Sequence, residues 1–124
     1  MRHVSKQSLK IAVRRRYGGV CIVRKTDNPD TAHIFPASIY PAIKLYDEVA
    51  IPLDRIVHNI DKDCFDKDSN GYTRPPHERV KWIKDKIDPD YISIFREQMK
   101  KLLILLRDKD MKYTLFEIEV NKDR

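Results

Sequence analysis

The stretch Thr31-Ala32-His33-Ile34-Phe35-Pro36 decides how the first half of this chain is expected to fold. The apolar run from Ala32 to Phe35 predicts a short strand, and Pro36 ends it because proline has no N–H to donate to a neighbouring strand. His33 places an ionisable imidazole within this run. A single histidine in such a place is typical of the edge of a core, so its interpretation depends on the segments around it.

A second histidine follows in a matching context. The run from Val49 to Leu53 predicts another short strand, because it is apolar and contains β-branched residues. Asp54 is a suitable N-cap for a helix from Arg55 to about Asp61, and His58 lies within that helix. The expected order is therefore strand, loop, strand and helix, with one histidine on the first strand and another on the helix.

The remaining segments predict an α+β domain. Apolar residues at spacings of three and four indicate three further helices, over residues 5–16, 77–87 and 89–106. β-branched and aromatic residues indicate two further strands, over residues 20–23 and 112–120. We therefore expect a single domain over residues 1–124, with a core of about residues 14–66 and a helical support layer of about residues 75–124. An N-terminal helix, two added C-terminal helices and a terminal strand surround the core.

The chain is basic. It contains 25 Lys and Arg residues against 19 Asp and Glu residues, which gives a formal net charge of +6 at pH 7. This balance suits a nucleic acid or another polyanion, and it suits a solvated lysine-rich surface equally well. The residues that we expect to contact phosphates lie on the first helix and shortly after it: Lys6, Lys10, Arg14, Arg15, Arg16 and Arg24.

The two cysteines, Cys21 and Cys64, form no CxxC or CxxH pair, so they do not indicate a zinc ribbon. The first residues contain no apolar segment typical of a secretory signal, and the longest apolar run, Leu102 to Leu106, is too short to span a bilayer. We therefore expect an intracellular protein, in the nucleus or the cytoplasm, with reduced cysteines and no membrane partner. The oligomeric state stays open.

Residues 14–66 resemble an HNH endonuclease domain, also called the ββα-metal or His-Me finger. The similarity is greatest to the variant common in fungal proteins, and it covers roughly the first half of the chain. Five short segments carry it: Arg14–Cys21, Ala32-His33-Ile34-Phe35-Pro36, Ile51-Pro52-Leu53, His58 and Asp61–Phe65. The resemblance implies a ββα-metal core.

The resemblance also implies metal-dependent hydrolysis of phosphodiester bonds, with DNA as the expected substrate. In this family the histidine that ends the first strand is the general base, which corresponds here to His33, and an imidazole suits that role because its pKa lies near neutral pH. The histidine on the helix binds one divalent cation, which corresponds to His58. Magnesium or manganese is the expected ion, with zinc as an alternative. Asp61 follows His58 by three residues, so on an α-helix it would share the same face as a second ligand or as a partner that orients the imidazole.

Two positions depart from the family pattern. Many relatives carry Asp or His immediately before the general base, where that residue binds the metal, and Ala32 stands there in this chain. The middle asparagine of the family corresponds to Val49, whose side chain can neither form a hydrogen bond nor bind a metal. These departures leave an alternative open: a catalytically degenerate HNH module that binds nucleic acid or a protein partner.

Overall fold

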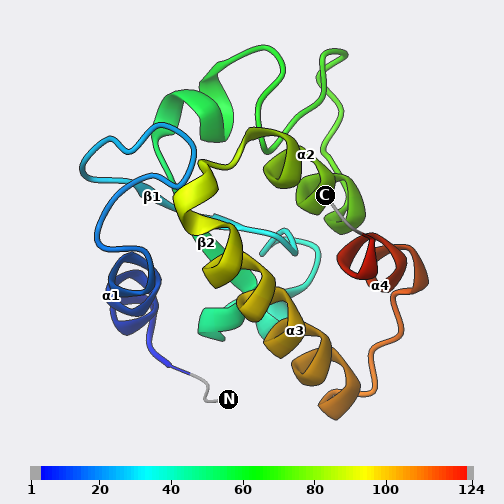
Figure 1. The fold of residues 1–124 in the computed structure, drawn as a ribbon. Helices are drawn as coiled ribbons and strands as arrows, with labels where there is room; N and C mark the ends of the chain where they lie inside the picture. Colours follow the sequence, from blue (N-terminus) through cyan, green and yellow to red (C-terminus); the bar gives the residue numbers. More distant parts are fainter. Residues whose placement is uncertain (1–3, 123–124) are drawn as a thin grey trace.

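The computed structural model describes residues 4–122 and combines helices with a small antiparallel sheet (Figure 1). The α-helices are α1 (Lys6–Arg16), α2 (Pro76–Lys86), α3 (Ile92–Asp108) and α4 (Thr114–Asn121). The strands are β1 (Asp30–His33) and β2 (Ala50–Leu53), and the π-helical segment η3 (Ile56–Ile60) follows β2. Three 3-10 turns connect these elements: η1 (Pro41–Ile43), η2 (Asp47–Val49) and η4 (Pro89–Tyr91). The expected mixture of helix and strand is confirmed.

The two strands form an antiparallel hairpin in which His33 pairs with Ala50 and Ala32 pairs with Ile51. Successive residues of a strand face opposite sides of a sheet, so Ala32 and His33 point away from each other. Ala32 is fully buried, whereas His33 stays partly accessible. β1 begins two residues earlier than expected and ends at His33. The hairpin therefore carries an apolar face toward the core and leaves His33 on the other side.

Helix α1 has the ends that the sequence predicts. The Ser5 hydroxyl oxygen accepts a hydrogen bond from the N–H of Ser8 at 3.1 Å, which caps the first turn. Leu9 and Val13 are buried on one face of the helix. Gly18 follows the helix with φ of 73°, a left-handed conformation that glycine adopts without steric cost. The apolar face packs against the hairpin, and the opposite face carries basic side chains to the surface.

The strand expected over residues 20–23 is not present, and only an isolated bridge at Val20 remains. The segment curls because the N–H of Lys25 donates to the carbonyl of Cys21 at 2.9 Å. The Cys21 sulfur also accepts from the N–H groups of Val23 and Arg24, both at 3.4 Å. These local contacts replace the partner strand that an extended segment would have needed.

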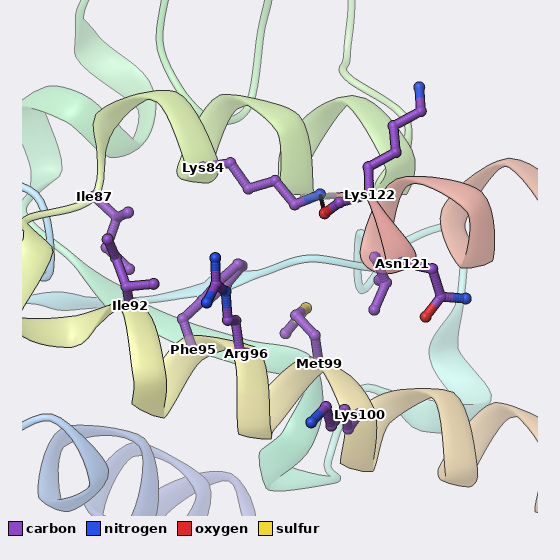
Figure 2. Close-up of a pocket in the computed structure, with 10 residues that line it drawn as sticks. Lys84, Ile87, Ile92, Phe95, Arg96, Met99, Lys100, Asn121 and Lys122 are labelled. Atoms are coloured by element: carbon purple, nitrogen blue, oxygen red, sulfur yellow. Dashed lines mark hydrogen bonds between the residues drawn. The ribbon is translucent and has the colours of Figure 1, made fainter. Parts of the chain in front are cut away.

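The terminal strand expected over residues 112–120 is wrong, because α4 occupies most of this range. Phe116 is fully buried, whereas Ile118, which a strand would turn to the same side, is 48% exposed. α4 packs against α2 and α3. Figure 2 shows Lys84 of α2 reaching the end of α4, where it donates to the carbonyl of Lys122 at 3.0 Å. Tertiary packing therefore outweighs the β propensity of this segment.

A continuous hydrophobic core joins the hairpin to the C-terminal helices. Phe35, just after β1, meets Phe116 of α4 edge to face with ring centroids 4.9 Å apart. Tyr40 and Tyr113 pack on the same ring. Within the described part of the chain, none of the helices has the length and apolarity needed to cross a bilayer. The aromatic cluster fixes the end of β1, and with it His33, against the helical half of the protein.

Candidate active site

His33 is the last residue of β1, and its imidazole is held by the loop that follows. Nε2 lies 2.9 Å from the carbonyl oxygen of Lys44. Because a carbonyl can only accept a hydrogen bond, Nε2 carries the proton and the neutral ring keeps a lone pair on Nδ1. Burial lowers the pKa of His33, and the nearby positive charges of Arg79 and His58 act in the same direction. A neutral, oriented imidazole is the form that a general base requires.

His58 lies on η3 between two carboxylates. Asp54 starts this turn, since its Oδ1 accepts from the N–H of Val57 at 3.1 Å, as the sequence predicts for an N-cap. Nδ1 of His58 lies 3.1 Å from Oδ2 of Asp30, and Nε2 lies 3.2 Å from Oδ2 of Asp66. Burial alone would lower the pKa of His58, but the hydrogen bonds and charges of Asp66 and Asp30 outweigh burial and raise it.

The structure brings the two histidines into one pocket of about 580 Å³. Its lining combines both imidazoles with three basic side chains and polar groups: Lys6, Leu9, Lys10, Asp30, Thr31, His33, Arg55, His58 and Asn59. Lys6 and Lys10 come from the exposed face of α1, as their spacing of four predicts. The pocket can therefore offer two imidazoles and several cations to an anionic ligand.

The other basic residues predicted to contact phosphates lie outside this pocket. Arg14 is partly buried and donates to the carbonyl of Pro29 at 3.1 Å. Arg15 lines a separate hollow beside η2. Arg16 forms an ion pair with Asp47 at 3.0 Å, and Arg24 forms one with Asp54 at 3.4 Å. The last two guanidinium groups therefore already have anionic partners within the protein.

Asp61 is not brought to the pocket that holds the histidines. The expectation that it shares a face with His58 assumed α-helical spacing, whereas η3 is a π-helical turn. The N–H of Asp61 bonds to the carbonyl of Ile56 at 2.9 Å, and its ψ of 150° takes the chain out of the helix. Asp61 is therefore an exposed C-cap residue of this turn.

Sequence reasoning does not single out Arg79, which the structure places behind the pocket, between the end of β1 and Asp66. Its side chain is only 4% exposed, and Nη1 donates to the carbonyl of His33 at 2.7 Å and to Oδ1 of Asp66 at 3.0 Å. Nε donates to the carbonyl of Arg74 at 2.8 Å. The available signal is the position of Arg79 beside Val80 in a helix whose apolar stripe faces the core. A charged residue so close to a buried stripe needs internal partners.

The two family positions that depart from the pattern are both part of the core. Ala32 and Val49 are fully buried, and the carbonyl of Val49 accepts from the N–H of Ile34 at 2.8 Å. Neither side chain can supply a metal ligand from there.

The chemistry of the surrounding groups fits a sparsely coordinated cation. Among residues 4–122, no group of three or more His, Cys, Asp or Glu side chains is arranged to hold a metal ion. His58 nevertheless has a carboxylate within 3.2 Å of each ring nitrogen. Magnesium is usually bound through one or two carboxylates, with waters and phosphate oxygens filling the other positions. An imidazole with one adjacent carboxylate is compatible with that mode of binding.

A second pocket lies between α2, α3 and the end of α4, as Figure 2 shows. It has a volume of about 240 Å³, and its floor is formed by Ile87, Phe95 and Met99. Basic side chains such as Arg96 and Lys100 stand at its edge. Neither His33 nor His58 lines it, so it is separate from the histidine pocket.

Comparisons with known proteins do not identify a family. No family model matches the chain, and neither the curated proteins nor the solved structures contain a match. The function must therefore be argued from the residues of the site itself.

Proposed function

We propose that the chain is a divalent-metal-dependent endonuclease that hydrolyses phosphodiester bonds in DNA. The observation that carries the proposal is the pocket that contains His33, His58 and the basic side chains of Lys6, Lys10 and Arg55. The order of β1, β2 and η3 along the chain agrees with the two strands and helix of a ββα-metal core. His33 acts as the general base, and His58 holds the cation.

In this proposal, the charge state of each residue determines its role in the reaction. Lys44 fixes the proton of His33 on Nε2, so the other ring nitrogen can accept a proton from the attacking water. The lowered pKa of His33 keeps the ring neutral at neutral pH. Lys6 and Lys10 attract and hold the phosphate backbone without reading bases. A bound divalent cation would polarise the scissile phosphate and stabilise the departing oxygen.

A plasmid-nicking assay tests this function. Wild-type protein should nick supercoiled DNA with magnesium or manganese, and a chelator should abolish the activity. His33→Ala should lower the rate by roughly 10²–10⁴-fold, which is the usual contribution of a general acid or base. Binding of DNA should change little, because His33 is not one of the cations of the pocket.

His77→Ala provides the matched control, since His77 lies on α2 and does not line the histidine pocket. Its nicking rate should equal that of the wild type. Absence of metal-stimulated nicking by the folded wild-type protein would reject the nuclease proposal.

A second candidate function is favoured by the burial of Ala32 and Val49. Because both side chains belong to the core, the site lacks ligands at two positions where relatives carry polar groups. The protein would then be a degenerate module that binds nucleic acid or a protein partner without cleaving it. Salt-dependent DNA binding without nicking supports the nucleic-acid form, and the absence of DNA binding supports the protein-partner form.

A further inference from the structure

We propose that the divalent cation binds between Nε2 of His58 and the carboxylate of Asp66, and that Asp30 and Arg79 position these two ligands. This inference rests on the proposed function, and it names a ligand that the resemblance does not supply. The evidence is the set of contacts around the imidazole of His58, which lies between the carboxylates of Asp30 and Asp66. Asp66 pairs in turn with Arg79.

The spacing of the two ligands suits one ion. Nε2 of His58 and Oδ2 of Asp66 lie 3.2 Å apart. Two neighbouring ligands bound at ~2.0–2.2 Å from the same cation are separated by about 3 Å. The backbone keeps them adjacent, because the N–H of Asp66 donates to the carbonyl of His58 at 3.0 Å. Without a cation, the same nitrogen carries a proton that Asp66 accepts.

Asp66 is connected to the end of β1 through Arg79. Nη1 of Arg79 donates both to Oδ1 of Asp66 and to the backbone carbonyl of His33. A single nitrogen atom therefore links the proposed ligand to the end of β1. A cation beside Asp66 would therefore be connected, through Arg79, to the strand end that carries the proposed base.

Asp30 fits the role of a positioning residue. Its Oδ2 lies 3.1 Å from Nδ1 of His58, so it accepts the proton of that nitrogen and leaves Nε2 for the cation. Arg55 holds the other oxygen of Asp30 at 3.5 Å. A carboxylate that binds the far nitrogen of a metal-binding histidine fixes the ring orientation and its tautomer.

Arg79 positions the other ligand. With a side chain only 4% exposed, its guanidinium holds Oδ1 of Asp66 and leaves Oδ2 directed to His58. Phe65 supports it from one side, at 5.0 Å from the guanidinium carbon to the ring centroid. Asp66 is therefore fixed by a rigid group and does not have to reorganise when the cation binds.

Manganese binding to the full chain tests the inference without any activity assay. Titration of the wild type followed by electron paramagnetic resonance should show one bound ion per chain. Asp66→Asn should weaken binding by at least about tenfold, and Asp30→Asn should weaken it by roughly 10–100-fold as a positioning residue. Asp85→Asn is the control, because Asp85 is exposed on α2 and should leave the affinity unchanged.

Asp61→Asn decides between the two carboxylates, because the sequence predicts Asp61 and the structure indicates Asp66. Its affinity should match the wild type. Wild-type affinity in Asp66→Asn, or a larger loss in Asp61→Asn, would overturn the proposal, as would a wild type that binds no manganese at millimolar concentration.

Nitrogen NMR of the wild type keeps the test decisive if Asp66→Asn fails to fold. With zinc as a diamagnetic probe, the ¹⁵N resonance of His58 Nε2 should shift, while Nδ1 keeps its proton to Asp30. A shift of Nδ1 instead would contradict the assignment. Metal binding as predicted without DNA cleavage would leave this inference standing and reject the nuclease function. If Asp66→Asn still cleaves DNA and binds metal with unchanged affinity, the role of Asp66 as a ligand is rejected and the nuclease function stands.

Discussion

Arg79 of α2 donates a hydrogen bond from Nη1 to the carbonyl oxygen of His33 at 2.7 Å, across 46 positions of the chain. The contact ties the helical half of the protein to the last residue of β1. Because the same guanidinium also pairs with Asp66, one buried cation links the backbone at His33 to the carboxylate beside His58. The geometry of the histidine pocket therefore depends on a residue that does not line it.

Arg79→Met should lower the free energy of unfolding by about 3–5 kcal/mol, the usual cost of removing one partner of a buried ion pair. Methionine preserves much of the packing volume, but it leaves the Asp66 carboxylate and the backbone carbonyls of His33, Asp66 and Arg74 without their donor. Urea denaturation monitored by circular dichroism measures the change. Arg96→Met is the control, because Arg96 is exposed on α3 and its replacement should stay within about 0.5 kcal/mol. An equal effect of the two substitutions would show that Arg79 has no special structural role.

The salt dependence of DNA binding should separate the two lysines of the pocket from other surface lysines. If Lys6 and Lys10 each neutralise one phosphate, the double replacement by glutamine should reduce the log–log salt slope by about 1.8, since each contact contributes about 0.9. Fluorescence anisotropy over a range of salt concentrations measures the slope. Lys101→Gln, on the exposed surface of α3, should leave it unchanged. A slope that is the same in the double variant and the wild type would place DNA elsewhere.

The sequence predicts those elements whose signals are local. The N-cap at Ser5, the N-cap at Asp54 and the buried stripe of α3 all appear as expected, because each depends on residues within a few positions. α4 is different, since the segment has high β propensity and yet forms a helix that packs Phe116 into the core. The turn after Val20 likewise depends on hydrogen bonds to the Cys21 sulfur, which a pattern of apolar residues does not predict.

The site residues also fall into two groups, those that the sequence predicts and those that only the structure shows. The resemblance assigns His33 and His58 to one site, and in the structure both line one pocket. The roles of Asp66 and Arg79 could not be predicted from the sequence, because their contacts connect segments that only the tertiary fold brings together. The same limit explains why spacing on α1 predicts Lys6 and Lys10 but not that Arg16 pairs with Asp47.

Glu48→Gln should stabilise the protein at pH 7, because the neutral amide removes a negative charge that burial disfavours. Glu48 is only 6% exposed and its Oε2 has no hydrogen-bond partner. Burial raises the pKa of this carboxyl, and the neighbouring Asp47 raises it further. The stabilising effect of the protonated form is therefore complete below the unfolded-state pKa and is lost as pH rises through the folded-state pKa. Thermal unfolding should show the difference at pH 7 and its disappearance near pH 4. A difference that grows toward acidic pH would contradict this sign.

Two substitutions in α4 should confirm its helical face. Phe116→Ala should cost about 3–5 kcal/mol, because Phe116 is fully buried against Phe35. Ile118→Lys should change stability by less than about 0.5 kcal/mol, since this side chain is 48% exposed. Chemical denaturation of both variants measures the difference. Similar large losses would instead indicate that residues 116 and 118 share a buried face, as in a strand.

Val49→Asn introduces the asparagine that the HNH resemblance expects at this position, and we expect it not to improve the site. The Val49 side chain is fully buried in the core, so an asparagine there would bring an amide into apolar surroundings. Leaving that amide unsatisfied should cost about 1–3 kcal/mol in the free energy of unfolding. Metal affinity and nicking should not rise, because the side chain does not line the pocket of His33 and His58. Val49→Thr is the matched control, since it keeps the branched shape and adds one small polar group. A gain in metal-stimulated nicking by a stably folded Val49→Asn protein would mean that this position can reach the site and that valine had weakened an otherwise complete HNH centre.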